Sequence, residues 1–351
     1  MAEKSSLSDR EKRSSSEDKE KHIRYCLEGE VESSLATGFE GFYLINNPLP
    51  EMDFEDVDIS CAFLGKDISA PFIISPMTGG SELSARINRN LARAAQELGV
   101  VMSVGSQRLA LEDTSLSASF QVRDVAPDIP LLANLGAIYL NYGYGLEECE
   151  RMVDMIGADA LVLYLNPMQK VFQGTGSINF EGLVEKIEHI CLHLSVPVIV
   201  KEVGFGLSSS AAVLLKDAGV SMLDVAGAGG TSWVKITRYL KDDFSGKTGS
   251  CFDDWGIPTA DSLISIQDAV KDVAIIASGG IRSGIEMAKA LALGASFTGM
   301  ALPLLAPAME SSDAVKKKIE SVIKELKVAM FCCGAINLEQ LKKGLCIRKL
   351  A

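Results

Sequence analysis

The stretch Lys201-Glu202-Val203-Gly204-Phe205-Gly206 decides the fold, read with Asp224-Val225-Ala226-Gly227-Ala228-Gly229-Gly230-Thr231-Ser232 and Ser278-Gly279-Gly280-Ile281-Arg282. In each stretch a short apolar run ends in a glycine-rich turn that carries polar side chains. The carboxyl-terminal rim of a parallel (β/α) barrel is built in this way, because glycine lets backbone N–H groups approach a phosphate. Three such turns on one chain favour a planar, phosphorylated cofactor, with flavin mononucleotide (FMN) as the leading candidate.

Short apolar runs recur along the chain, and amphipathic stretches separate most of them. Strands without polar alternation are buried on both faces, and their alternation with helices indicates parallel pairing. Eight repeats predict a closed barrel rather than an open sheet. The expected strands are Phe72–Ser75, Val101–Val104, Leu131–Asn134, Ala160–Leu165, Val196–Lys201, Met222–Ala226, Ala274–Ser278 and Phe297–Gly299. The expected helices are Ala85–Leu98, Glu147–Met155, Phe180–His193, Ser209–Asp217, Ser262–Val270, Gly284–Leu293, Asp313–Leu326 and Leu338–Leu345.

These patterns predict an α/β fold, a single (β/α)8 TIM barrel with an irregular N-terminal extension. Residues 1–22 are dominated by Ser, Glu, Lys, Asp and Arg without apolar periodicity, and we expect a flexible arm there. Residues 23–66 form an irregular lead-in, and residues 67–345 form the FMN-binding barrel. The polar stretch Trp233–Trp255 suits a lid, an inter-subunit segment or a plain long loop equally well.

The bulk composition excludes several classes of function. The chain has 351 residues, 47% of them hydrophobic, and a formal net charge of −12. This charge argues against binding to nucleic acid or to an anionic membrane. The absence of a long apolar run and of a signal-peptide pattern leads us to expect a cytoplasmic protein. Only three histidines are present, which argues against a histidine metal site or a Ser-His-Asp triad. The eight cysteines form no C-x-x-C pair and are expected to be reduced core thiols.

Ligand groups in such a barrel come from the residues that follow each strand. Lys201, at the end of the fifth strand, would place its ammonium beside the flavin and stabilise an anionic reduced flavin. A plain salt-bridge partner is the alternative interpretation of this lysine. Thr231 and Ser232 could bind the ribityl chain or the phosphate, and Gly280 lies where barrel phosphate sites form. The full set of expected cofactor contacts is Thr78, Gly79, Ser106, Asn134, Lys201, Thr231, Ser232, Gly280, Arg282 and Ala301.

The same residues resemble a known family, type 2 isopentenyl-diphosphate isomerase, in collinear order over most of the chain. The motifs that carry the resemblance are Met77-Thr78-Gly79-Gly80, Gly105-Ser106-Gln107-Arg108, Asn134-Leu135-Gly136-Ala137, Leu165-Asn166-Pro167-Met168-Gln169, residues 201–206 and 224–233, Asp254-Trp255-Gly256-Ile257-Pro258-Thr259 and residues 277–284. The resemblance implies a (β/α)8 barrel with FMN that NAD(P)H reduces, a Mg²⁺ requirement, and homotetramers or larger assemblies. It also implies interconversion of isopentenyl and dimethylallyl diphosphate without net redox change.

The resemblance assigns roles on the substrate side as well. It implies that Arg108, Asn166 and Gln169 contact a small diphosphate substrate, with the Gln169 amide close to the reacting carbons. N5 of the reduced flavin would be the acid and base, because a double-bond shift adds a proton at one carbon and removes one from another. Lys19, Lys21 and His22 are placed to close over an anion.

The chain departs from the family pattern on the substrate side. The Mg²⁺-binding Glu of the family is Lys170, so no metal ligand is predicted here, and its strand-four His is Tyr164. The family's Gln-Pro-Glu-Gly-Asp is Gln173-Gly174-Thr175-Gly176-Ser177, and the Arg expected before Lys19 is Asp18. Mg²⁺ prefers carboxylate and phosphate oxygens, so binding at this loop should be weakened. Lys170 could instead pair directly with a diphosphate.

Three hypotheses therefore stay open. The first is an FMN-dependent isomerase of isopentenyl diphosphate. The second is a flavin-binding paralogue with an altered substrate or no isomerase activity, because the departures gather on the substrate side. The third is an FMN barrel oxidoreductase, which would be expected to carry a catalytic His or Cys at a strand end.

Overall fold

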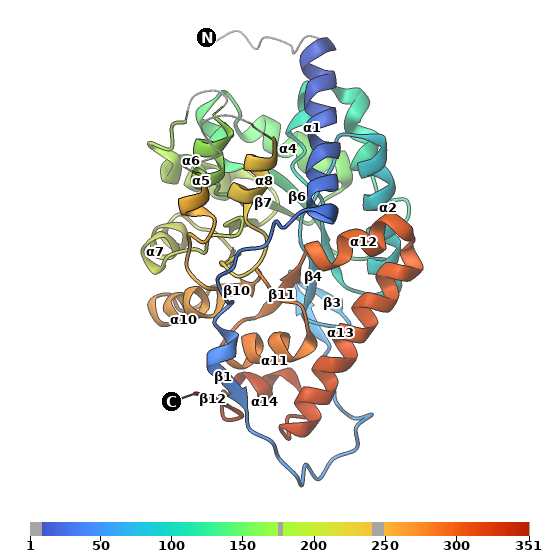
Figure 1. Ribbon diagram of the computed structural model, residues 1–351, viewed down its shortest axis with the longest axis vertical. Helices are drawn as coiled ribbons and strands as arrows, with labels where there is room; N and C mark the ends of the chain where they lie inside the picture. Colours follow the sequence, from blue (N-terminus) through green and yellow to red (C-terminus); the bar gives the residue numbers. More distant parts are fainter. Residues whose placement is uncertain (1–8, 175–177, 241–248, 351) are drawn as a thin grey trace.

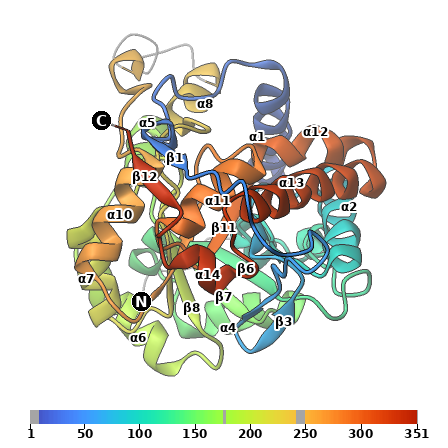
Figure 2. The same ribbon diagram turned by 90° about the horizontal axis from the view of Figure 1, so that it is seen from below.

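The computed structural model describes residues 9–174, 178–240 and 249–350, with side chains from residue 19 onward. Eight parallel strands form a closed barrel in the order β10-β11-β4-β5-β6-β7-β8-β9, surrounded by helices (Figures 1 and 2). The strands are β4 (Phe72–Ile74), β5 (Val101–Ser103), β6 (Leu131–Gly136), β7 (Ala160–Tyr164), β8 (Val198–Lys201), β9 (Met222–Asp224), β10 (Ala274–Ala277) and β11 (Phe297–Met300). The predicted barrel and its eight strands are confirmed, with ends that differ by up to two residues.

Alternate residues of each strand face the two sides of the barrel wall. Ile73, Leu132 and Val162 point inward and pack together inside the barrel, whereas their neighbours along the strands pack against the helices. A hairpin of β2 (Cys61–Phe63) and β3 (Lys66–Ile68) covers the amino-terminal end of the barrel, where Phe63 meets Phe297 edge-on at 5.0 Å between ring centroids. The hairpin leaves the carboxyl-terminal end for a binding site.

The helices cover the outside of the barrel. The predicted helices are confirmed as α2 (Glu82–Leu98), α4 (Leu146–Ile156), α6 (Leu183–His193), α7 (Ser209–Asp217), α10 (Thr259–Ala269), α11 (Gly284–Ala292), α13 (Ser312–Cys332) and α14 (Leu338–Lys342). Further helices are α1 (Asp9–Glu28), α3 (Arg108–Glu112), α5 (Pro167–Gln173), α8 (Trp233–Leu240) and α12 (Leu302–Glu310), with short 3₁₀ turns at Phe39–Gly41, Thr114–Ser119, Ala137–Asn141 and Gly249–Phe252. No helix in the described part of the chain is long and apolar enough to cross a membrane.

The N-terminal extension differs from the expected flexible arm. From Asp9 onward it is the helix α1, while residues 1–8 lie outside the described residues. No glycine or proline interrupts this segment, and its last turns pack on the barrel. Ile23 is buried, and Tyr25 stacks on Tyr239 of α8 at 5.2 Å between ring centroids. Tertiary packing therefore stabilises a helix that the polar composition alone does not predict.

The lead-in and the C-terminus meet at the far end of the molecule from α1 (Figure 1). β1 (Phe42–Leu44) pairs antiparallel with β12 (Ile347–Lys349), so the ordered fold continues past residue 345, where the sequence analysis ended the barrel. The polar stretch Trp233–Trp255 contains α8 and a 3₁₀ turn. Residues 241–248, which hold much of its polar sequence, lie outside the described residues, so the lid, the inter-subunit segment and the plain loop all stay open as interpretations of this stretch.

Close packing of α11 on α13 makes Gly284 a sensitive position. A Cβ at Gly284 would lie 2.3 Å from the backbone nitrogen of Leu326 and 2.3 Å from the carbonyl oxygen of Val322. We expect Gly284→Ala to lower the stability to urea by about 1–3 kcal/mol, because two backbones must move apart. The control is Gly41→Ala, where a Cβ meets nothing within 4 Å and the midpoint should stay unchanged. Equal midpoints for both variants would contradict this packing.

Candidate active site

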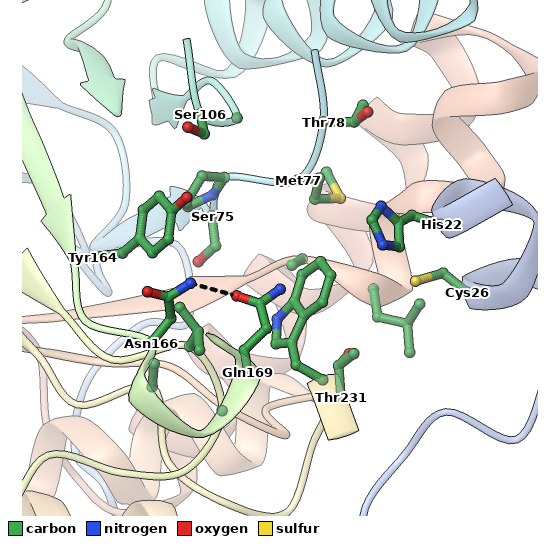
Figure 3. A pocket seen from close by; sticks show the side chains of 18 of the residues that line it. His22, Cys26, Ser75, Met77, Thr78, Ser106, Tyr164, Asn166, Gln169 and Thr231 are labelled. Atoms are coloured by element: carbon green, nitrogen blue, oxygen red, sulfur yellow. Dashed lines mark hydrogen bonds between the residues drawn. The ribbon is translucent and has the colours of Figure 1, made fainter. Parts of the chain in front are cut away.

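A cavity of about 460 Å³ opens at the carboxyl-terminal end of the barrel (Figure 3). Of the residues predicted to contact the cofactor, the substrate or an anion, all except Lys21, Gly79 and Ser232 line it. Those that line it are Lys19 and His22 from α1, Thr78 after β4, Ser106 and Arg108 after β5, Asn134 in β6, Asn166, Gln169 and Lys170 after β7, Lys201 at the end of β8, Thr231 after β9, Gly280 and Arg282 after β10, and Ala301 after β11. Residues that follow the eight strands thus meet in one cavity, as the sequence analysis predicts for a barrel.

Gly79 and Ser232 lie beside the cavity rather than in its wall. A Cβ at Gly79 would lie 1.9 Å from the ring of Phe120, so this glycine is required for packing. Ser232 is buried at the start of α8, where its hydroxyl accepts a hydrogen bond from the backbone of Lys235 at 3.5 Å. Gly79 and Ser232 both follow barrel strands, as the sequence motifs predict. Their contacts with Phe120 and Lys235 nevertheless leave them outside the cavity wall.

Lys201 is held at the rim by groups on two neighbouring strands. The parallel register of β8 and β9 sets Lys201 opposite Asp224, and the Lys201 ammonium lies 3.8 Å from the Asp224 carboxylate. The ammonium also donates to the carbonyl of Glu202 at 2.5 Å, and the Asp224 carboxylate accepts from the Ser278 hydroxyl at 2.6 Å. Burial raises the pKa of Asp224. The cation is therefore fixed in place beside the cavity by its surroundings.

The turn after β8 is organised around the buried carboxylate of Glu202. One carboxylate oxygen accepts hydrogen bonds from the backbone N–H groups of Val203, Gly204 and Phe205, at 2.5, 2.9 and 2.6 Å. Burial raises the pKa of Glu202 to about 7, although these bonds and the charge of Lys201 act in the opposite direction. Val203 and Gly204 line the cavity, so this carboxylate shapes part of its wall.

Buried polar atoms without protein partners show where a ligand would bind. The side-chain nitrogen of Asn134, the hydroxyl of Ser75 and the side-chain oxygen of Asn166 find no hydrogen-bond partner among the described residues. Buried polar groups are normally satisfied, so these three atoms in the cavity wall are suited to a ligand. Thr78 differs, because its hydroxyl already contacts that of Ser84 at 2.8 Å.

The two glycine-rich turns after β9 and β10 pack directly on each other. Gly280 has a positive φ of 76°, and a Cβ there would lie 2.4 Å from the carbonyl oxygen of Gly229. Arg282 lines the cavity next to this turn and forms an ion pair with Glu32 of the lead-in. With Lys201 and the unsatisfied atoms of Asn134 and Ser75, these turns fit a planar group that carries a phosphate.

Asn166 and Gln169 form a hydrogen-bonded pair in the same cavity (Figure 3). Asn166 precedes α5, whose first residue is Pro167, a residue favoured at that position. The Asn166 side chain donates to the side-chain oxygen of Gln169 at 2.7 Å, and both side chains are buried. This bond fixes the orientation of the Gln169 amide and leaves its NH₂ group available to the cavity.

Positive side chains surround Tyr139, which the sequence analysis missed. Lys170 donates to the Tyr139 hydroxyl at 3.0 Å, and the Arg108 guanidinium lies 5.0 Å from the centre of the Tyr139 ring. Arg108 also pairs with Glu112, which lies behind it and accepts from Tyr144 at 2.7 Å. Tyr139 lies in the 3₁₀ turn after β6. Its position after a predicted strand could have identified it as a residue of the site.

The helix α1 contributes one face to the cavity. Lys19, His22, Ile23 and Cys26 all line it, at the spacing that places residues on one side of a helix. Burial, followed by the charge of Arg108, lowers the pKa of Lys19 to about 8. Burial, followed by the charge of Lys19, lowers the pKa of His22 to about 3. Ile23 and Cys26 could have been found from the sequence only if this segment had been predicted as a helix.

The charge of the cavity wall is one-sided. Lys19, Arg108, Lys170, Lys201 and Arg282 line it, and within the described part of the chain no Asp or Glu does. The described residues also contain no group of three or more His, Cys, Asp or Glu side chains that could hold a metal ion. Ser177, one of the departures from the family pattern, lies outside the described residues. Arg108, Lys201 and Arg282 pair with carboxylates that lie outside the wall, so the surface of the cavity itself carries positive charge and favours an anionic ligand.

Tyr164 occupies the position where the family pattern has histidine. Its side chain reaches towards Ser106 in the cavity (Figure 3). Burial raises the pKa of Tyr164 to about 12, so its hydroxyl stays protonated at neutral pH. The site therefore has a neutral hydroxyl where an imidazole is expected.

Comparison with known proteins agrees with this geometry. Residues 35–122 and 166–348 match the model of the FMN-dependent dehydrogenase family. An isopentenyl-diphosphate delta-isomerase of Oceanobacillus iheyensis is 47% identical over 92% of this chain and 93% of its own length. One of Nostoc sp. is 46% identical over 94% and 95%. A lactate oxidase of Pediococcus acidilactici has a TM-score of 0.69 at 17% identity, over 97% of this chain and 93% of its own, which shows the fold alone. The chain therefore belongs to the FMN-dependent dehydrogenase family and, within it, to the type 2 isopentenyl-diphosphate delta-isomerases.

Proposed function

We propose that this protein is an FMN-dependent isomerase that interconverts isopentenyl diphosphate and dimethylallyl diphosphate. One observation carries the proposal: the hydrogen-bonded Asn166–Gln169 pair shares a cavity with the flavin-side residues and with a wall of cations free of carboxylates. Shifting the double bond of a small diphosphate ester requires an amide that positions the reacting carbons, a flavin that exchanges the proton, and cations that bind the diphosphate. One cavity holds residues suited to all three tasks. The relatives at 46–47% identity, named for this activity, support it.

The flavin side would be held by groups from several strands. Lys201 would face the ring, Asn134 and Ser75 would use their unsatisfied atoms, and the turn at Gly280 with Arg282 would take the phosphate. When bound and reduced, FMN supplies the proton donor and acceptor for the allylic shift. Lys201 contributes a fixed positive charge that favours a negatively charged ring.

The protein's own contribution on the substrate side is orientation. Because Asn166 binds the oxygen of Gln169, the Gln169 NH₂ group is directed at the cavity and cannot rotate freely. A positioned amide fixes the reacting carbons relative to the acid and the base, and this restriction lowers the entropy cost of the reaction. The Tyr164 hydroxyl adds a polar but uncharged group to the wall, because its raised pKa keeps it protonated.

We propose that Lys170 and Arg108 bind the diphosphate directly. Both contact Tyr139, which holds them on one side of the cavity, and Lys19 reaches the same place from α1. An ammonium and a guanidinium bind phosphate oxygens through charge-assisted hydrogen bonds, so they can replace a bridging cation. Mg²⁺ would then be dispensable or needed only weakly.

Further parts of the proposal rest on the family resemblance. NADPH would be the reductant, the protein would act in isoprenoid biosynthesis in the cytoplasm, and it would assemble as a homotetramer or a larger homo-oligomer. Light scattering on the purified protein gives the mass of the assembly. A rate of flavin bleaching with NADPH that exceeds the rate with NADH identifies the reductant.

The oxidoreductase alternative lacks its expected residue. A histidine or cysteine at a strand end would be needed beside the flavin, but in the described part of the cavity wall His22 and Cys26 both come from α1. The altered-substrate alternative is favoured by Lys170 and Tyr164. Both are tested by an anaerobic assay with FMN, NADPH and isopentenyl diphosphate, with and without Mg²⁺, that follows dimethylallyl diphosphate. Flavin binding and reduction without turnover would support the altered-substrate alternative.

Replacing Gln169 tests its role in the chemistry. We expect Gln169→Ala to lower turnover by about 10²–10⁴-fold, because the amide that orients the reacting carbons is removed. FMN affinity, measured by fluorescence quenching, should stay within a few-fold of the wild type. Gln121→Ala, at an exposed position, is the control and should leave both unchanged. A parallel loss of FMN affinity and turnover in Gln169→Ala would instead show a structural role.

Lys170 determines the metal dependence. We expect the wild type to keep most of its turnover in EDTA, because cationic side chains take the place of Mg²⁺. Lys170→Glu should raise the KM for the diphosphate about tenfold or more without metal, and added Mg²⁺ should restore it. Lys317→Glu makes the same charge change on the exposed face of α13 and should behave as the wild type. A wild type that loses turnover in EDTA and regains it with Mg²⁺ contradicts this role.

A further inference from the structure

Two cysteines flank a short segment at the end of the chain, away from the cavity. The helix α13 is followed by Cys333 and a turn at Gly334, where φ is 73°. The chain then forms α14, turns at Gly344 with φ of 69°, and reaches Cys346 just before β12. We call residues 333–346 the C-terminal turn segment. Its two ends meet the same part of the lead-in.

Backbone hydrogen bonds show that the two ends of this segment lie close together. Ile45 donates to the carbonyl of Cys346, and Asn47 donates to that of Cys332, each at 2.7 Å. Because these two donors are only two residues apart in the chain, they lie at most about 7 Å from each other. The backbones at Cys346 and at Cys332 therefore lie against neighbouring residues of the lead-in, which brings the two cysteine-bearing parts of the chain side by side.

The side chains select one of the two adjacent cysteines. Cys332 is exposed, whereas Cys333 is half-buried and packs against the same core cluster as Cys346. The side chains of Cys333 and Cys346 interact with each other. The Cys346 thiol also donates to the carbonyl of Leu341 at 3.8 Å, within the same segment. The partner of Cys346 is therefore Cys333 and not its exposed neighbour.

We propose that Cys333 and Cys346 are an oxidisable pair that hydrogen peroxide, or a comparable hydroperoxide, converts into an intramolecular disulfide. The Cys346 thiolate attacks one peroxide oxygen, the O–O bond breaks, and hydroxide leaves to give a sulfenic acid. The Cys333 thiol then attacks that sulfur, and water leaves as the S–S bond forms. Two thiols are oxidised, one peroxide is reduced, and two waters are formed in all.

The local chemistry favours Cys346 as the attacking thiol. The interaction with Cys333 lowers the pKa of Cys346, against the effect of burial, and the same contact raises the pKa of Cys333. Thiolate is the reactive form, so the direction of these shifts makes Cys346 the nucleophile of the pair. Burial acts in the opposite direction on the other thiols whose pKa shifts, since it raises the pKa of Cys26, Cys61, Cys149 and Cys191.

The disulfide would close the C-terminal turn segment into a ring. That ring precedes β12, which pairs with β1, and Cys346 also accepts the bond from Ile45. Oxidation would thus fasten the end of α13 to the strand that holds the lead-in. The cavity lies at the carboxyl-terminal end of the barrel, and neither Cys333 nor Cys346 lines it.

Peptide mapping tests the proposal on the full-length protein. The protein is treated with hydrogen peroxide, its remaining thiols are blocked with iodoacetamide, and trypsin cleaves after lysine and arginine. The cysteines fall in the peptides 328–342 and 344–348, so a Cys333–Cys346 bond joins these two. We expect the joined peptide in oxidised wild type and its loss after dithiothreitol.

Three variants assign the bond. Cys332→Ser is the matched control and should keep the joined peptide, whereas Cys333→Ser and Cys346→Ser should lose it. Circular dichroism shows whether each variant is folded, and the wild-type mapping stands even if one of them is not. The proposal is overturned if the joined peptide persists in Cys333→Ser, if only a Cys332–Cys333 bond forms, or if both thiols stay reduced while exposed Cys251 is oxidised.

Discussion

The pairing of β11 with β4 is the constraint on which the rest of the molecule depends. It sets Met300 beside Ile74 and joins strands that lie more than two hundred residues apart in the chain. Once this pair forms, the strands have no free edge and all their carboxyl ends share one rim. Residues from each part of the barrel sequence then converge on one cavity, while the hairpin of β2 and β3 covers the opposite end.

The wall of the cavity is positively charged. The side chains that line it are cationic, aromatic or neutral within the described residues, and the nearest carboxylates, such as Glu112 and Asp224, lie behind the cations they support. Burial lowers the pKa of Lys19, which means that a charged ammonium there is disfavoured until an anion arrives. A bound anion would therefore stabilise the charged form of Lys19.

The strands could be predicted because each is buried on both faces and therefore reads as an apolar run. The site residues after the strands followed from the same pattern, since strand ends converge whatever the loops do. Two kinds of feature could not be predicted. Gly79 and Ser232 match their motifs, yet the direction of a group in a loop depends on packing against Phe120 or Lys235. The helix α1 depends on contacts with α8, more than two hundred residues away, and nothing in its own polar sequence encodes them.

The pairing of β1 with β12 also has a consequence for the order of assembly. Phe42 of β1 pairs with Lys349 of β12. The whole barrel must therefore be synthesised before β1 can form its hydrogen bonds. Contacts of such large sequence separation form late and slowly. During synthesis the lead-in therefore exposes an unpaired strand edge, and the nascent chain is most vulnerable to wrong strand pairing until residues 347–349 emerge.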